Sequence, residues 1–203
     1  MQVCRVAPVT HLQVRLKDGI RAAAIAVAML LAVSSLPSAS HAQSATDAPL
    51  SERSVMATYI YRFITYAEWP ASVFPNADAP IVIGVVNADD IAAELEQVVR
   101  GRTAQNRRLQ VRRIGPSEAV TDAHVLFVGR DVAPKYFQAA KSLAERPVLT
   151  ITDSERGADQ GSMINFVQAD GRVRFEVNVA VAEKSGIRLS SKLLTVAMRV
   201  RPG

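Results

Sequence analysis

The spacing of apolar positions predicts a helix at the start of the folded part of the chain. Between Glu52 and Glu68, apolar residues recur at steps of three and four, which places them on one face of a helix. That face consists of Val55, Met56, Tyr59, Ile60, Phe63, Ile64 and Ala67. Pro70 is expected to end the helix, because proline lacks the backbone N–H that a further turn would need.

Short apolar runs further along the chain predict β-strands. Residues 81–86, 124–128 and 147–152 have strand length and are mostly apolar, as expected for strands covered on both faces. Residues 109–114 alternate apolar side chains with polar ones, so that strand is expected to have one wet face. Helix-length segments at 90–100 and 134–144 separate these strands, and this alternation favours parallel pairing.

The last part of the chain predicts a different arrangement. Residues 163–167 and 172–179 flank Asp170-Gly171, a strong signal for a two-residue β-hairpin turn. A final amphipathic helix over 190–200 is expected to dock through Leu193, Leu194, Val196 and Ala197. The sequence therefore predicts one α/β domain over residues 51–203. Its mixed, mainly parallel sheet is flanked by helices and ends in an antiparallel hairpin and a C-terminal helix.

The first 42 residues have the three parts of an export signal. Arg5, Arg15, Lys17 and Arg21 supply the charge, and the apolar core at 22–36 is shorter than the about 20 residues of a spanning helix. Ser40-His41-Ala42 then offers small residues at the cleavage point. We expect cleavage near Ala42, a periplasmic product, and a disordered tether at residues 43–50. The alternative is an uncleaved N-terminal anchor.

Charge and cysteine content narrow the function. The formal net charge is +5, but residues 1–42 hold four basic residues and one acidic residue, which leaves 20 basic and 18 acidic residues in the mature chain. With that balance, the mature chain lacks the strong positive charge that is typical of nucleic-acid-binding proteins. Six arginines at 100–113 have no aromatic residues among them, so we interpret them as a solvated strand edge, with an anionic partner as the alternative. The single cysteine is Cys4, so the mature domain is expected to fold without disulfides.

Candidate chemistry is sparse. His124 is the one histidine of the mature chain and is expected to be structural, and neither a zinc spacing nor a glycine-rich phosphate loop occurs in the sequence. The carboxylates Asp89 with Asp90, and Asp153 with Glu155, follow predicted strands, where α/β sheets bind ligands. Acids at such positions more often cap helices and form turns. We therefore expect no enzyme activity, no cofactor and no metal.

Two surfaces are candidates for binding a partner. The first helix and its exit carry most of the aromatic residues, and Arg62, Tyr66 and Trp69 are our nominees, because arginine and aromatic side chains anchor many interfaces. Trp69 also suits the core. The second surface is the polar face of the hairpin, with Arg172, Arg174 and Glu176.

Several segments together resemble the YfiR family. They are YRFITYAEWP, IVIGVV, RPVLTITD, GSMINFVQADGRVRFEVNV and GIRLSSKLL. The resemblance extends from about residue 55 to residue 200, and its most specific part is 161–194.

The resemblance implies a periplasmic repressor that forms a homodimer. Such a protein binds the periplasmic sensor domain of a membrane-bound diguanylate cyclase, which lowers cyclic di-GMP and biofilm formation, and an outer-membrane lipoprotein sequesters it. The family's type member has redox-sensitive disulfides, and the lack of cysteine in the mature chain rules out that control here. The alternatives are a small-ligand binding protein that serves another inner-membrane sensor and, more distantly, a hydrolase.

Overall fold

The computed structural model describes residues 51–203, so the predicted signal peptide and tether lie outside the described residues. The elements are, in chain order, α2 (Glu52–Tyr66), β1 (Ala67–Glu68), η1 (Ala71–Val73), β2 (Ile81–Val86), α3 (Asp89–Val99), β3 (Thr103–Ala104), β4 (Arg107–Ile114), β5 (Val125–Val128), α4 (Ala133–Ala139), η2 (Lys141–Glu145), β6 (Leu149–Thr152), η3 (Gly157–Gln160), β7 (Ile164–Ala169), β8 (Arg172–Asn178), α5 (Val179–Lys184), β9 (Arg188–Leu189), α6 (Ser191–Val196) and β10 (Arg199–Arg201). The three elements labelled η are 3-10 helices.

Within residues 51–203, eight strands form one sheet in the order β10-β8-β7-β6-β5-β2-β4-β3. The pairs from β4 through β2, β5 and β6 to β7 are all parallel, as the alternation of strands and helices predicted. The pair β7–β8 is antiparallel, as predicted for the hairpin, and β3–β4 is also antiparallel. The predicted fold class is therefore confirmed.

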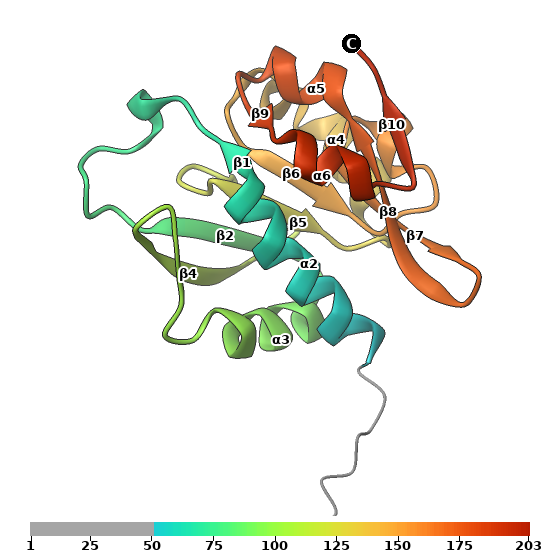
Figure 1. Cartoon of the computed structure of the whole chain (residues 1–203), viewed down its shortest axis with the longest axis horizontal. Coiled ribbons are helices and arrows are strands. Elements are labelled where there is room, and N and C mark those ends of the chain that lie inside the picture. The colour runs from blue at the N-terminus through green and yellow to red at the C-terminus, as the bar shows by residue number, and fades with distance from the viewer. Residues whose placement is uncertain (1–50) are drawn as a thin grey trace, which may run out of the picture. The chain divides into compact units, whose positions relative to one another are not determined.

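Helices cover the sheet on both faces, which explains the continuous apolar runs of its central strands. Val125 and Phe127 of β5 belong to the core beneath α2 and α3, whereas Leu126 and Val128 belong to a second core beneath α4. Successive side chains of a strand point to opposite faces, so a strand buried on both sides needs an apolar residue at every position. Figure 1 shows α2 and α6 in front of the sheet, with α3 below them.

The hairpin turn has the predicted geometry. Ala169 pairs with Arg172, and the two residues between them have positive φ, 53° at Asp170 and 68° at Gly171. A second turn of the same length, Gln105-Asn106 between β3 and β4, also has positive φ at both positions. That turn contains no glycine, so the sequence carried a weaker signal for it.

The first helix is shorter than the predicted 52–68. It ends at Tyr66, before Pro70 is reached, because Ala67 and Glu68 form β1 and pair antiparallel with β9. The predicted apolar face is otherwise confirmed, since Met56, Ile60 and Phe63 are fully buried. The third predicted helix is also shorter, since α4 ends at Ala139 and continues as η2.

The prediction of one helix over 190–200 was wrong in its second half. The helix α6 ends at Val196, and the chain then extends into β10, where the Met198 N–H donates to the carbonyl of Phe175 at 2.8 Å. Pairing with β8 thus replaces the last helical turn. Leu193 is buried as expected, but Val196 is 63% exposed and does not dock.

In the described part of the chain, none of the helices has both the length and the hydropathy that crossing a membrane would require.

Candidate partner interface

The outer face of α2 presents part of the first predicted surface. Arg62 is exposed, whereas Phe63 and Ile64 beside it are fully buried. None of the ion pairs within residues 51–203 involves Arg62. Tyr66 is half-buried against the core, and its carbonyl accepts a hydrogen bond from the Ser190 N–H at 2.9 Å. Arg62 therefore offers a free guanidinium, and Tyr66 offers the exposed part of its ring.

Trp69 lies at the exit of α2 and lines a cleft of about 470 Å³ between β1 and the α5–β9 connection. Its ring meets Phe74 edge-on, with centroids 6.5 Å apart, and is half-buried. The indole nitrogen is buried and makes no hydrogen bond within the described residues. Trp69 thus packs on the core and also faces an open cleft, and its role as a partner anchor stays a prediction.

The hairpin surface lies on the other side of the sheet. Val173 and Phe175 of β8 are buried, and the Phe175 ring contacts Tyr59 of α2 at a centroid distance of 5.5 Å. Because side chains alternate along a strand, Arg172 and Arg174 project from the opposite face. The structure therefore does not bring them together with Arg62, Tyr66 and Trp69.

Glu176 occupies a different environment from the two hairpin arginines. Arg172 and Arg174 are exposed, but Glu176 is only 8% exposed and pairs with Arg199 of β10 at 3.5 Å. Its carboxylate therefore already has a partner inside the chain.

Of the carboxylates singled out from the sequence, Asp153 is the most constrained. It is buried, and Arg130 donates to it twice, from the backbone N–H to one oxygen and from Nε to the other, both at 2.9 Å. Arg53 donates to Asp153 at 3.1 Å and also pairs with Asp90 at 2.7 Å. The hydrogen bond from Arg130 to Asp153 and the negative charge of that carboxylate raise the pKa of Arg130.

This charge cluster of Arg53, Asp90, Arg130 and Asp153 occupies the place where an α/β sheet would bind a ligand. The chain passes from β2 to β4 on one side and then returns to β5 on the other, so the strand order reverses between β2 and β5. A Cβ at Gly129, directly after β5, would overlap the carbonyl of Asn87 after β2. Packing and internal ion pairs fill this crevice, which favours a structural role for Asp153.

The remaining two predicted carboxylates have no shared site. Asp89 is exposed and pairs with Arg113 at 3.4 Å, and Glu155 is exposed. Sequence reasoning missed Arg53 and Arg130, because neither lies in a motif and Arg53 is 100 positions from Asp153.

His124 has the structural role expected for it. Its Nδ1 accepts a hydrogen bond from the Val82 N–H at 3.1 Å, and its ring stacks on Phe74 at 4.7 Å. Burial, and then the charge of Arg107, lower the pKa of His124, although Asp122 opposes them. The side chain is therefore neutral at neutral pH and acts as a hydrogen-bond acceptor.

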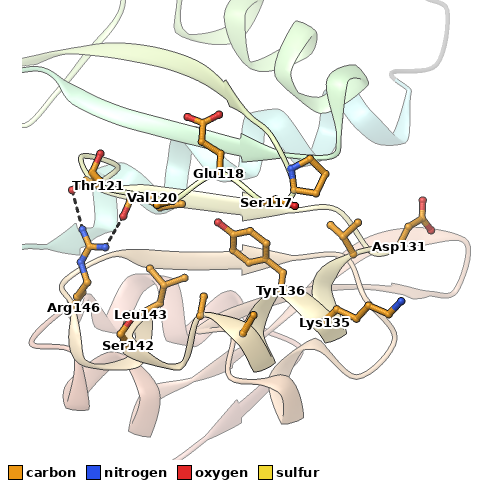
Figure 2. Close-up of a pocket in the computed structure, with 15 residues that line it drawn as sticks. Ser117, Glu118, Val120, Thr121, Asp131, Lys135, Tyr136, Ser142, Leu143 and Arg146 are labelled. Atoms are coloured by element: carbon orange, nitrogen blue, oxygen red, sulfur yellow. Dashed lines mark hydrogen bonds between the residues drawn. The ribbon is translucent and has the colours of Figure 1, made fainter.

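A cavity of about 750 Å³ lies on the α4 side of the sheet, away from α2, between the 116–121 loop, α4 and η2. Figure 2 shows the Tyr136 side chain pointing toward the Ser117–Glu118 loop. At one end, the Arg146 guanidinium donates to the carbonyls of Val120 and Thr121 at 2.6 and 2.9 Å. The volume is within the range of small-molecule sites. Three separate segments build the cavity, so no local motif predicted it.

A comparison with protein families matches most of the chain. The model of the family described as YfiR/HmsC-like matches residues 53–198, which is well over half of the 203-residue chain. The match starts in α2 and ends two residues after α6, so it includes both predicted surfaces. The chain belongs to the YfiR/HmsC-like family.

Proposed function

We propose that this protein is a periplasmic repressor that binds the periplasmic sensor domain of a membrane-bound diguanylate cyclase and holds the cyclase inactive. Less cyclic di-GMP, and hence less biofilm, would follow. The main support for this proposal is the family match over residues 53–198, since the family points to periplasmic regulation of diguanylate cyclase signalling. Homodimerisation and capture by an outer-membrane lipoprotein belong to the same proposal.

The site geometry supports a binding role. Asp153 and His124 would be the first candidates for catalytic residues if the protein were a hydrolase. Both make internal contacts that hold the fold together. Arg62, in contrast, has no ion pair within residues 51–203 and stands beside the part-exposed ring of Tyr66. Arginine and tyrosine anchors supply much of the binding energy at protein interfaces.

The test is binding of the purified protein to the periplasmic domain of a cyclase encoded nearby. Arg62→Ala and Tyr66→Ala are each expected to weaken binding by about 1 kcal/mol or more, because both remove an anchor from the interface. Arg62→Ala should leave the melting temperature nearly unchanged, since Arg62 is exposed. Titration calorimetry measures the first effect and a thermal melt the second.

Arg172→Ala is the matched control, because Arg172 is an exposed arginine on the opposite face of the sheet. If both α2 variants bind like the parent and Arg172→Ala does not, the interface is on the hairpin face. In cells, deletion of the gene should raise cyclic di-GMP. The repressor proposal fails if the parent binds no cyclase domain and deletion leaves cyclic di-GMP unchanged.

A second candidate is a small-ligand binding protein that serves another inner-membrane sensor. The cavity beside Tyr136 favours it, because its volume of about 750 Å³ suits a small molecule.

A further inference from the structure

The exposed large apolar side chains of residues 51–203 gather in one short segment. They are Val196, Met198 and Val200, which are 63%, 48% and 38% exposed. Single exposed apolar residues are ordinary on a protein surface, but a local group of them marks an interaction site. This segment leads from the end of α6 into β10.

The strand β10 also has an open edge. It pairs in parallel with β8, and no strand of the described residues pairs with its other side. The Asn178 N–H bonds to Met163 across the hairpin, so the backbone groups of Val177 face β10. Because Val200 lies opposite Val177, the bonds of β10 to β8 come from Arg199 and Arg201. The N–H and C=O groups of Val200 therefore face outward, where an added strand would find them.

The two faces of this edge differ in chemistry. Val200 pairs with the buried Val177, so Val200 and Met198 lie on the α6 side of the sheet. Arg199 pairs with Glu176 and therefore lies on the opposite face, as does Arg201 two residues later.

That opposite face carries a surplus of positive charge. Arg199 is ion-paired with Glu176, and Arg201 with Asp159. Arg172 and Arg174 of β8 project from the same face and have no ion pair within residues 51–203. Two acidic groups thus stand against four arginines.

We propose that the open edge of β10 binds an extended segment of a partner protein in which acidic and apolar residues alternate. The segment adds a strand to the sheet, as in other strand-addition complexes. Its apolar side chains pack on Met198 and Val200, and its carboxylates meet the arginine face.

A second copy of this chain suits the edge less well. Antiparallel pairing of two β10 strands about Val200 would place Arg199 of one copy opposite Arg201 of the other. Like charges directly opposite each other destabilise a strand pair. Charge complementarity therefore favours an acidic segment.

The test uses two labelled peptides, one of alternating Glu and Val and one of alternating Lys and Val, with fluorescence anisotropy as the readout. The protein should bind the Glu–Val peptide in preference, and added NaCl should weaken that binding because it screens the arginines. Equal binding of the two peptides would overturn the proposal.

Val200→Pro tests the backbone part of the proposal. Proline removes only the outward N–H at this position, since the ladder bonds to β8 come from Arg199 and Arg201. We expect about a tenfold loss of Glu–Val peptide binding, because a main-chain hydrogen bond is lost. Val200→Ala is the matched control, because it shortens the same side chain but keeps the N–H, and it should cost only about two- to threefold. Equal losses in the two variants would contradict strand addition.

Two further measurements test for misfolding of the proline variant and for self-association of the edge. If Val200→Pro does not fold, the triple variant Val196→Ser, Met198→Ser, Val200→Thr removes the apolar part of the edge and should also lose peptide binding. If the parent sediments as a dimer that Val200→Pro converts to a monomer, the edge is a self-interface and the proposal is wrong. No cyclase enters these measurements, so their failure leaves the proposed function standing.

Discussion

At the scale of single residues, His124 shows how a buried titratable group is kept in one state. Its Nδ1 accepts from the Val82 N–H and its ring lies flat on Phe74, so protonation would remove an acceptor that the β2 backbone uses. Burial and the positive charge of nearby Arg107 both disfavour the protonated ring, so they lower the pKa of His124 below 6.5. The consequence is a dependence of stability on pH.

The direction of this pH dependence follows from proton binding in the folded and unfolded states. The unfolded chain binds the proton near pH 6.5, and the folded chain binds it only at lower pH, so the free energy of unfolding falls as pH drops below about 6.5. Urea denaturation at pH 7.5 and 5.5 should therefore show a larger loss for the parent than for His124→Gln. Equal losses for the two proteins would show that His124 does not carry this dependence.

At the scale of elements, the turn between β7 and β8 is set by backbone conformation. Gly171 has φ of 68° and nothing within 4 Å of the position that a Cβ would occupy. A Cβ at this position would therefore meet no clash, and its cost would come from the positive φ.

Gly171→Val should lower the free energy of unfolding by about 1–3 kcal/mol, because a β-branched residue is strained at positive φ. Gly171→Asn is the matched control and should cost less, since asparagine tolerates this conformation. Denaturant midpoints compare the two. An unchanged midpoint for Gly171→Val would mean that the hairpin relaxes without strain.

At the scale of the whole molecule, the charge cluster ties distant parts of the chain together. Arg53 at the start of α2 contacts Asp90 in α3 and Asp153 after β6, and Arg130 after β5 contacts the same Asp153. The carboxylate of Asp153 is 4% exposed, whereas Arg53 and Arg130 are 34% and 51% exposed. Asp153 is therefore the member whose loss leaves the most bonds unmade.

Asp153→Ala should destabilise the fold by roughly 2–3 kcal/mol, less than for a fully buried pair because both arginines can turn to water. Glu155→Ala is the matched control, since Glu155 is exposed two residues away, and its effect should stay within about 0.5 kcal/mol. Urea midpoints measure both. Equal effects would show that the cluster contributes nothing beyond an exposed acid.

The sequence by itself determined the elements whose signal is local. The runs at 81–86 and 124–128, the apolar face of α2 and the Asp170-Gly171 turn were all predicted, because side-chain period and turn chemistry are encoded within a few neighbouring residues. Family membership also followed from contiguous segments, chiefly residues 161–194.

Only the tertiary structure decided the features that depend on distant partners. The end of α2 at Tyr66 requires the pairing of β1 with β9, and the change from helix to strand after Val196 requires the free edge of β8. The separation of Arg62 from Arg172, and the meeting of Arg53 with Asp153, likewise depend on which faces the sheet covers. The physical reason is that strand pairing and burial are properties of contacts between residues far apart in the chain, and local spacing does not encode them.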